Sequence, residues 1–191
     1  MRDAAALRET RREEILDGAI EVFGRLGFRK AGMEDVAAAA RISKQGLYLH
    51  FSSKEALFSE AMRKYLEDGQ ALVDRELAKT GARLLDRLTA AMDAWFGRHL
   101  STFGRNALDI IDADGVVGKD GTDKYKAWFR KRLAEVLSAD AEFARGGNIC
   151  SAEDVAHALY IAGLTWKEER GPRAAFAKKM RLCTRVACQL A

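Results

Sequence analysis

Residues 43–51 carry side chains of the kinds that bind nucleic acid without reacting with it. A lysine ammonium pairs with a phosphate, a glutamine amide hydrogen-bonds the edge of a base, and a glycine lets the backbone approach a ligand closely. Leu47 and Phe51 are apolar, so we expect them to face a small core and to leave the polar row outside. That row consists of Lys44, Gln45, Gly46, Tyr48 and His50.

Two short helices must position this row. The sequence predicts the first helix over residues 33–40 and the second over residues 43–51. Two helices that cross closely need a small residue on the first, an apolar residue after the turn and another in the middle of the second. Ala37, Ile42 and Leu47 stand at these three places. The spacing therefore predicts a helix-turn-helix.

Plainer interpretations of the same residues remain open at this point. Helix-turn-helix shapes also occur in proteins that do not bind DNA, and Lys44 and Lys54 fit ordinary solvated charges as well. Tyr48 could be a core aromatic residue and His50 a plain surface residue. Because Leu47 already fills the inward face, we expect Tyr48 to point outward.

The rest of the chain predicts an all-α fold. Its 191 residues include a single proline, whereas strand-rich folds use several prolines in turns. Apolar residues recur at helical spacing, and capping boxes are expected where Ser52 precedes Glu55 and where Ser151 precedes Asp154. Among the expected helices are residues 10–26, 52 to about 77, 151 to about 166, and 172–190.

The segment Ile15–Ala61 resembles the DNA-binding domain of the tetracycline-repressor (TetR) family. The resemblance implies a helix-turn-helix DNA-binding domain over residues 1–55 and a helical ligand-binding and dimerisation domain over residues 56–191. The matching runs are Val22–Phe28, Met33–Ala40, Ile42–Phe51 and Ser53–Leu57.

The resemblance also assigns roles to individual residues. It implies that Lys44, Gln45 and Gly46 face the major groove of a duplex, and that Tyr48 and His50 contact phosphates. Lys54 would meet a phosphate at the beginning of the fourth helix, where free backbone N–H groups favour anions. Ser43, which begins the second helix of the motif, belongs to the same predicted surface.

Two positions depart from the family pattern. Gly32 stands where the family often has a threonine or serine that caps the helix and contacts a phosphate, so that contact is in doubt. Arg41 stands in the turn where the family often has glycine, so we expect mild backbone strain if its φ angle is positive. Arg41 could also supply a phosphate contact of its own.

The C-terminal part of the chain contains residues for an apolar or aromatic ligand. A stripe of aromatic residues at helical spacing also fits a plain core, and His99 and His157 could be polar contacts or structural residues. The candidate pocket residues are Met92, Trp95, Phe96, Phe103, Ile110, Trp128, Phe129 and Tyr160.

Residues 155–166 are apolar nearly all round, which requires cover on both sides. These apolar faces could be covered by a second subunit, or they could be buried within the same chain. The family resemblance implies that the last two helices pair with those of a second subunit, giving a four-helix interface. The candidate interface residues are Val155, Leu159, Ala162, Trp166, Phe176, Met180, Cys183 and Ala187.

Other classes of protein receive little support. The chain has no signal peptide, no apolar run long enough to cross a membrane and no catalytic or phosphate-binding motif, so we expect a cytoplasmic protein that is not an enzyme and has no cofactor. The three cysteines lack metal-site spacing, and the acidic loop from Asp109 to Asp120 lacks the calcium-loop pattern, so no metal is expected.

The resulting hypothesis is a homodimeric transcriptional regulator. It would repress one or a few operons by binding a palindromic double-stranded DNA operator, and an unidentified small molecule would release it. The alternative is an architectural or protein-interacting DNA-binding protein without an inducer. A net charge of only +4 fits either hypothesis.

Overall fold

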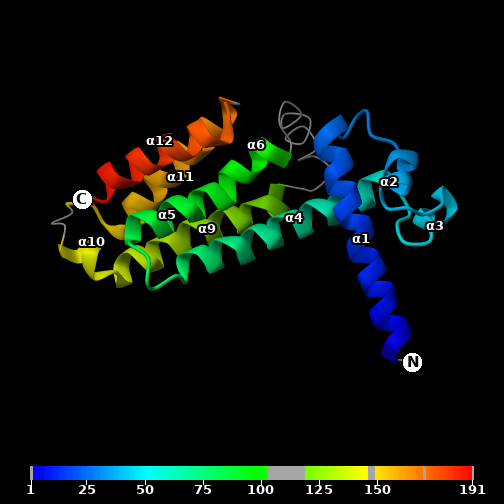
Figure 1. Ribbon diagram of the computed structural model, residues 1–191, viewed down its shortest axis with the longest axis horizontal. Helices are drawn as coiled ribbons and strands as arrows, with labels where there is room; N and C mark the ends of the chain where they lie inside the picture. Colours follow the sequence, from blue (N-terminus) through cyan, green and yellow to red (C-terminus); the bar gives the residue numbers. More distant parts are fainter. Residues whose placement is uncertain (1, 103–118, 146–148, 170, 191) are drawn as a thin grey trace. The chain divides into compact units, whose positions relative to one another are not determined.

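The computed structural model describes residues 2–102, 119–145, 149–169 and 171–190, and every regular element in these ranges is helical (Figure 1). This confirms the expected all-α fold. The described residues belong to two compact units, one built on Met1–Glu67 and the other on Asp68–Ser101 and Asp120–Ala191. The division falls within one long helix, while the predicted boundary between residues 55 and 56 lies near the beginning of that helix.

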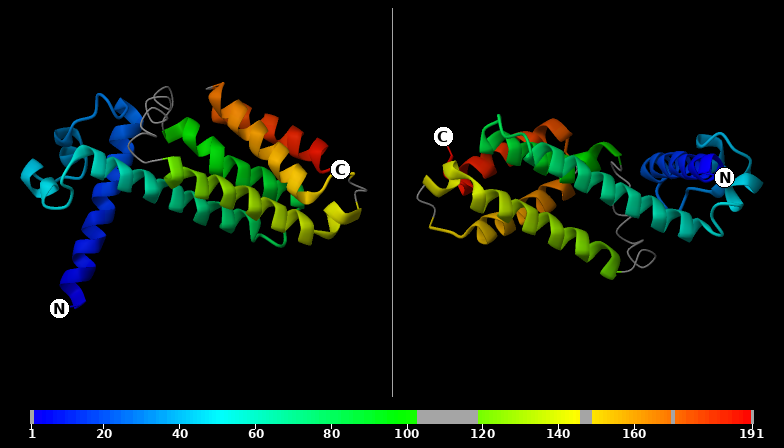
Figure 2. Two further views of the ribbon diagram at one scale, coloured as in Figure 1. Left: turned by 180° about the vertical axis from the view of Figure 1, so that it is seen from behind. Right: turned by 90° about the horizontal axis from the view of Figure 1, so that it is seen from below.

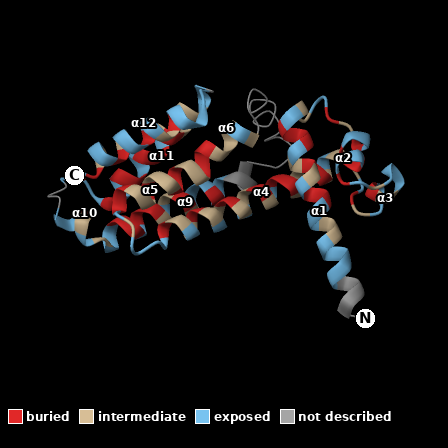
Figure 3. Ribbon diagram, viewed as in Figure 1, coloured by how far each residue is buried: buried red, intermediate tan, exposed pale blue. Residues whose placement is uncertain are grey.

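The first unit is a bundle of short and long helices around one apolar core. Its elements are α1 (Arg2–Leu26), α2 (Met33–Ala39), α3 (Lys44–Tyr48) and the first part of α4 (Lys54–Leu77). Figure 3 shows buried segments on α1, α2 and α4, and residues of these helices form one apolar cluster. Phe23 meets Phe58 edge to face, with ring centroids 5.0 Å apart, which joins α1 to α4.

The ends of these helices follow from single residues. Gly27 ends α1 with a φ angle of 79°, and its N–H donates to the carbonyl oxygen of Phe23 at 2.9 Å. The predicted cap at Ser52 is wrong by one residue. Ser53 Oγ accepts a hydrogen bond from the N–H of Ala56 at 3.1 Å, so the second of two adjacent serines is the cap.

The second unit packs helices along one another. It holds the rest of α4, α5 (Leu84–Met92), η1 (Asp93–Gly97), α6 (Arg98–Thr102, to Ser101), α9 (Lys119–Ala139), α10 (Ala141–Arg145), α11 (Ala152–Glu168) and α12 (Arg173–Ala187). The last helix, α12, packs against α11, α5 and η1 (Figure 2). The expected capping box of Ser151 and Asp154 begins α11, while Pro172 stands just before α12.

Two half-buried arginines connect the helices of this unit. Arg87 donates to the carbonyl oxygen of Leu77 at 2.9 and 2.6 Å and pairs with Asp140 at 3.1 Å, so it joins the ends of α4, α5 and α9. Arg132 of α9 pairs with Asp74 of α4 at 2.6 Å. Without these arginines, the Leu77 carbonyl and the two carboxylates would lose the hydrogen bonds that compensate for their partial removal from water.

The element η1 is a π-helical turn that the sequence pattern does not predict. The Asp93 side chain occupies the space beside Gly97, and a Cβ atom at Gly97 would lie 2.0 Å from Oδ1 of Asp93. The last residue of the turn therefore has to be a glycine while Asp93 keeps this position. The Asp93 carboxylate also accepts hydrogen bonds from the guanidinium of Arg173 at 2.6–3.1 Å. This ion pair joins the π-turn to the beginning of α12. No helix among the described residues is long and apolar enough to cross a membrane.

Candidate nucleic-acid interface

The second helix of the motif, α3, is held by its cap and by one buried leucine. Ser43 Oγ accepts a hydrogen bond from the N–H of Gly46 at 2.9 Å, which makes Ser43 the N-cap rather than a helical residue. Leu47 is fully buried and Phe51 nearly so, as the spacing predicts. One face of α3 is thus fixed to the core and the opposite face is left outside.

The turn before α3 is strained at Arg41, where mild strain was expected if φ is positive. Arg41 has a φ angle of 54°, in the left-handed region that glycine adopts at little cost. The turn is nevertheless well bonded, since the N–H of Ile42 donates to the carbonyl oxygen of Ala37 at 2.9 Å. Arg11 of α1 donates to the carbonyl oxygen of Arg41 at 3.3 Å, and the Arg41 side chain is exposed.

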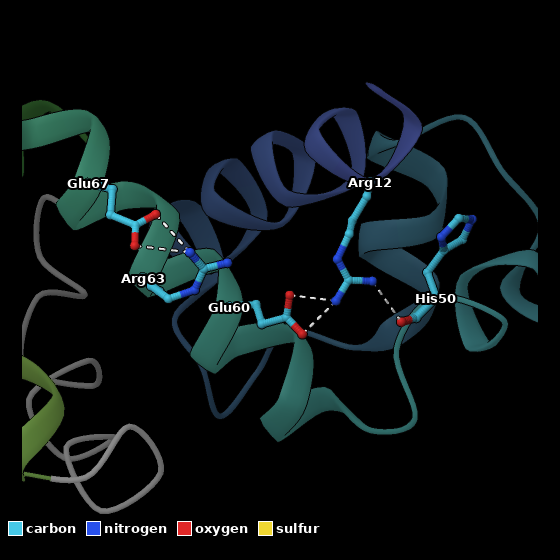
Figure 4. Close-up of polar contacts among 5 residues, drawn as sticks. All are labelled: Arg12, His50, Glu60, Arg63 and Glu67. Atoms are coloured by element: carbon cyan, nitrogen blue, oxygen red, sulfur yellow. Dashed lines mark hydrogen bonds and ion pairs between the residues drawn. The ribbon is translucent and has the colours of Figure 1, made fainter. Parts of the chain in front are cut away.

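Arg12 fixes the far end of the motif, a role that the sequence analysis misses. Its Nη2 atom donates to both carboxylate oxygens of Glu60, and its Nη1 atom donates to the carbonyl oxygen of His50 at 3.2 Å (Figure 4). The guanidinium also lies 4.4 Å from the centre of the Phe51 ring. Arg12 precedes Ile15 by one helical turn, so its place on the apolar stripe of α1 was a usable signal.

The outward row is exposed to different degrees. Lys44, Gln45 and Tyr48 are exposed, and Tyr48 keeps 47% of its surface, so it is not a core residue. Gly46 and His50 are half-buried. Sequence reasoning also missed Leu49, whose side chain is 84% exposed beside this row. An exposed leucine at such a place can contact the methyl group of a thymine.

The two lysines of the predicted surface are both held by other groups. Lys44 forms an ion pair with Glu34 of α2, and its ammonium group lowers the pKa of Glu34 through a hydrogen bond and its charge. The Glu34 carboxylate raises the pKa of Lys44 in turn. Lys54 donates to the carbonyl oxygen of Arg29 at 3.4 Å and lies 4.6 Å from the centre of the Phe28 ring.

The candidate pocket residues of the second unit come together as a packed aromatic cluster. Trp95 stacks on Phe129 with centroids 4.9 Å apart, Phe96 meets Phe129 edge to face at 5.6 Å, and Tyr160 lies 5.5 Å from Phe96. Trp128 adjoins Trp95 at 5.9 Å, and Met92 is fully buried. The predicted residues Phe103 and Ile110 lie outside the described residues.

The candidate interface residues separate into two groups. Val155, Leu159, Phe176 and Met180 are buried within the protomer, so they are closed to a partner in this conformation. Burial within the chain, the alternative left open by the sequence, accounts for these four. The others are partly exposed: Ala162, Trp166, Cys183 and Ala187.

A different set of apolar residues is exposed on the last two helices. Ile161 of α11 is 45% exposed, and Leu182 and Val186 of α12 are 56% and 69% exposed. A groove of about 410 Å³ runs along this face, and its lining is almost entirely apolar. The lining residues are Trp166, Lys179, Leu182, Cys183, Val186 and Ala187.

Comparison with known proteins identifies the first unit. Residues 15–61 match the model of the family described as bacterial regulatory proteins, tetR family. The chain is 37% identical over 89 residues to the transcriptional activator FasR of Mycolicibacterium smegmatis, covering 47% of this chain and 40% of that protein. It is 39% identical over 66 residues to the transcriptional repressor KstR2 of Rhodococcus jostii, covering 35% and 32%. The chain thus spans about a third to two fifths of these relatives.

Solved structures extend the likeness of the fold to nearly the whole chain. A transcriptional regulator from Rhodococcus sp. RHA1 matches with a TM-score of 0.71 at 18% identity, covering 93% of this chain and 96% of the other. AibR, solved in complex with isovaleryl coenzyme A and operator DNA, matches with a TM-score of 0.60 at 23% identity, covering 90% and 96%. Residues 15–61 therefore match the tetR family of bacterial regulatory proteins, and the solved structures show that the fold of nearly the whole chain is shared with transcriptional regulators.

Proposed function

We propose that the protein is a homodimeric transcriptional regulator that represses one or a few operons from a palindromic operator. The observation that carries the proposal is the geometry of α3, which fixes Leu47 in the core and presents Gln45 and Tyr48 on the outside. Glutamine amides and tyrosine hydroxyls are suited to bases and phosphates in the major groove. Both an activator and a repressor occur among the relatives, so the sign of regulation needs its own measurement.

A second copy of the chain is the partner that places two recognition helices on one operator. Dimers of helix-turn-helix proteins read two half-sites about one helical turn or a multiple of it apart. The exposed face of α11 and α12, with Ile161, Leu182 and Val186, supports this assembly because three large apolar side chains there lack cover. Two helices from each subunit would meet there and bury this face.

A small apolar or aromatic effector would act in the second unit. The cluster around Phe129 supports this site, because it gathers aromatic rings from η1, α9 and α11, and these rings would have to separate to admit a ligand. A π-helical turn beside such a cluster is a common mark of a functional site. The complex of AibR with isovaleryl coenzyme A supports an acyl group as one candidate for the apolar part. The effector releases DNA only if it binds the DNA-free conformation of the protein more tightly than the DNA-bound conformation.

The experiment that tests the proposal begins with selection of genomic fragments by the purified protein. Fluorescence anisotropy of the best fragment over a salt series then gives affinity and selectivity. A Lys44→Ala, Tyr48→Ala double variant removes two of the exposed contacts, and a Lys131→Ala variant removes an exposed cation from α9 as a matched control. We expect tight, salt-sensitive binding to a short palindrome, lost in the double variant and retained in the control.

Other results would contradict the proposal. Weak binding without sequence preference, indifferent to the double variant, would remove the operator hypothesis. Selective binding to many scattered genomic sites would favour the architectural alternative instead. Transcription from the bound promoter, measured with and without the protein, distinguishes repression from activation.

A further inference from the structure

The ammonium group of Lys44, the first residue of α3, is bonded to a carboxylate of its own chain. Glu34 reaches it from the first turn of α2, so the ion pair crosses the turn of the helix-turn-helix. The side chains of Lys44 and Glu34 are 52% and 65% exposed, so a duplex can reach both. The cation that a phosphate would neutralise is thus already neutralised within the protein.

The beginning of α2 gathers a second acidic group beside this pair. The N–H of Gly32 donates to Oδ2 of Asp35 at 2.8 Å. A Cβ atom at Gly32 would lie 3.2 Å from Oε2 of Glu34 and 3.3 Å from Oδ2 of Asp35, so the glycine leaves room for both carboxylates. The N-terminus of a helix attracts anions, and here two side chains of the protein already take that place.

We propose that Glu34 competes with DNA phosphate for Lys44 and thereby sets the selectivity of the protein for its operator over other DNA. The proposal rests on the proposed function. Binding to arbitrary DNA comes almost entirely from cations that replace counterions on phosphates. A lysine that must leave Glu34 first adds little to such binding, whereas base contacts at an operator do not depend on that exchange.

The test compares the operator fragment with a scrambled duplex of equal length, using fluorescence anisotropy between 50 and 200 mM salt, a range chosen to resolve counterion release. Glu34→Gln keeps the size of the side chain and removes its charge. We expect it to raise affinity for the scrambled duplex about fivefold to tenfold near 0.1 M salt and to steepen the salt dependence by roughly one counterion. The ratio of operator to scrambled affinity should fall.

Two further variants separate a local effect from a change in net charge. Glu21→Gln removes one exposed carboxylate from α1 and is the matched control. Lys44→Ala combined with Glu34→Gln completes a double-variant cycle, in which the effect of Glu34→Gln should disappear. Circular dichroism of each variant checks that the helices are intact.

The outcomes distinguish the failure of this proposal from the failure of the proposed function as an operator-binding regulator. If the unaltered protein prefers no fragment, the proposed function fails and this inference fails with it. If the protein is selective and Glu34→Gln acts no more strongly than Glu21→Gln, only the inference is overturned. A Glu34→Gln effect that persists without Lys44 overturns it as well, because the competition would then not involve that lysine.

Discussion

The guanidinium of Arg12 binds both carboxylate oxygens of Glu60, at 2.5 and 2.6 Å, and so joins α1 to α4 beside the end of the recognition segment. The same guanidinium holds the carbonyl oxygen of His50. Its side chain keeps 30% of its surface and that of Glu60 keeps 32%, so solvent only partly screens the pair. The orientation of α3 therefore depends on a contact made outside the helix-turn-helix.

Removing this contact should weaken both the fold and DNA binding. Arg12→Ala leaves the Glu60 carboxylate and the His50 carbonyl without their donor, and we expect the free energy of unfolding to fall by about 1–2 kcal/mol. Urea denaturation of Arg12→Ala, Glu60→Gln and the double variant measures the coupling of the two residues. Additive losses would show that the pair contributes no coupling energy.

Arg41 should be replaceable by glycine without loss of stability. Its φ angle of 54° is strained for any residue with a Cβ atom, and relief of that strain offsets the greater freedom of glycine in the unfolded chain. We expect Arg41→Gly to change stability by between zero and about +1 kcal/mol, and Arg41→Val to lower it by about 1–2 kcal/mol. Lys30→Gly, at an exposed position without a positive φ angle, is the control in thermal unfolding. Equal destabilisation by both glycines would contradict this expectation.

Gly163 should not tolerate even a methyl group. A Cβ atom there would lie 2.5 Å from two ring atoms of Phe96 and 2.8 Å from Cε of Met92. Gly163→Ala should therefore lower stability by about 1–3 kcal/mol and alter the near-ultraviolet dichroism of the aromatic cluster. Gly81→Ala is the control, because an added carbon there would meet no residue within 4 Å apart from its own chain neighbours. A fully stable Gly163→Ala variant with an unchanged spectrum would show that α11 does not pack this closely.

His99 should make the protein sensitive to mild acid. Desolvation by burial, together with the positive charges of Lys167 and Arg98, lowers the pKa of His99 well below its ordinary value of 6.5. Below pH 6.5 the unfolded chain therefore binds a proton at His99 that the folded chain does not bind. The contribution of His99 to the free energy of unfolding is fully present above pH 6.5 and is lost as the pH falls below that value.

The slope expected from this single group is up to about 1.4 kcal/mol per pH unit. His99→Gln should flatten the dependence of unfolding free energy on pH between 6.5 and the lower pKa. Parallel pH curves for the unaltered protein and His99→Gln would refute the assignment. Chemical denaturation at a series of pH values provides the comparison.

A charge on the exposed face of α12 should prevent self-association. Leu182 and Val186 are more than half exposed, and a glutamate at either position would place a charge in the proposed apolar interface. We expect Leu182→Glu and Val186→Glu to sediment as monomers and to bind a two-half-site operator more weakly. Leu49→Glu, an equally drastic change at an exposed leucine of the first unit, should leave the sedimentation coefficient unchanged. Dimers that persist in both α12 variants would place the interface elsewhere.

The sequence predicts the helix-turn-helix well because local spacing determines it. Ala37 and Leu47 are buried as expected, and Arg41 has the positive φ angle under which mild strain was expected. Caps are harder to predict when candidates stand side by side. Ser52 and Ser53 are both suitable caps, and only the hydrogen bond to the N–H of Ala56 distinguishes them.

The faces of the last helices could not be assigned from spacing. A helix that is apolar nearly all round, such as α11, gives no signal for which side meets its own chain. Leu159 was therefore a candidate interface residue although it is fully buried, and Ile161, which is 45% exposed, was not among the candidates. The π-turn was hidden for a similar reason, because Trp95 and Phe96 fit the apolar stripe of an α-helix too.

The π-turn gives the second unit a discrete choice of register. A π-helical turn holds one residue more than an α-helical turn, and each residue of an α-helix turns the chain by about 100°. Rewinding Asp93–Gly97 into an α-helix would therefore rotate α6 relative to α5 by a fixed step rather than a graded one. Asp93 forms an ion pair with Arg173 of α12, and Trp95 stacks on Phe129 of the aromatic cluster. Such a step would therefore have to displace the ion pair and the stacked rings together.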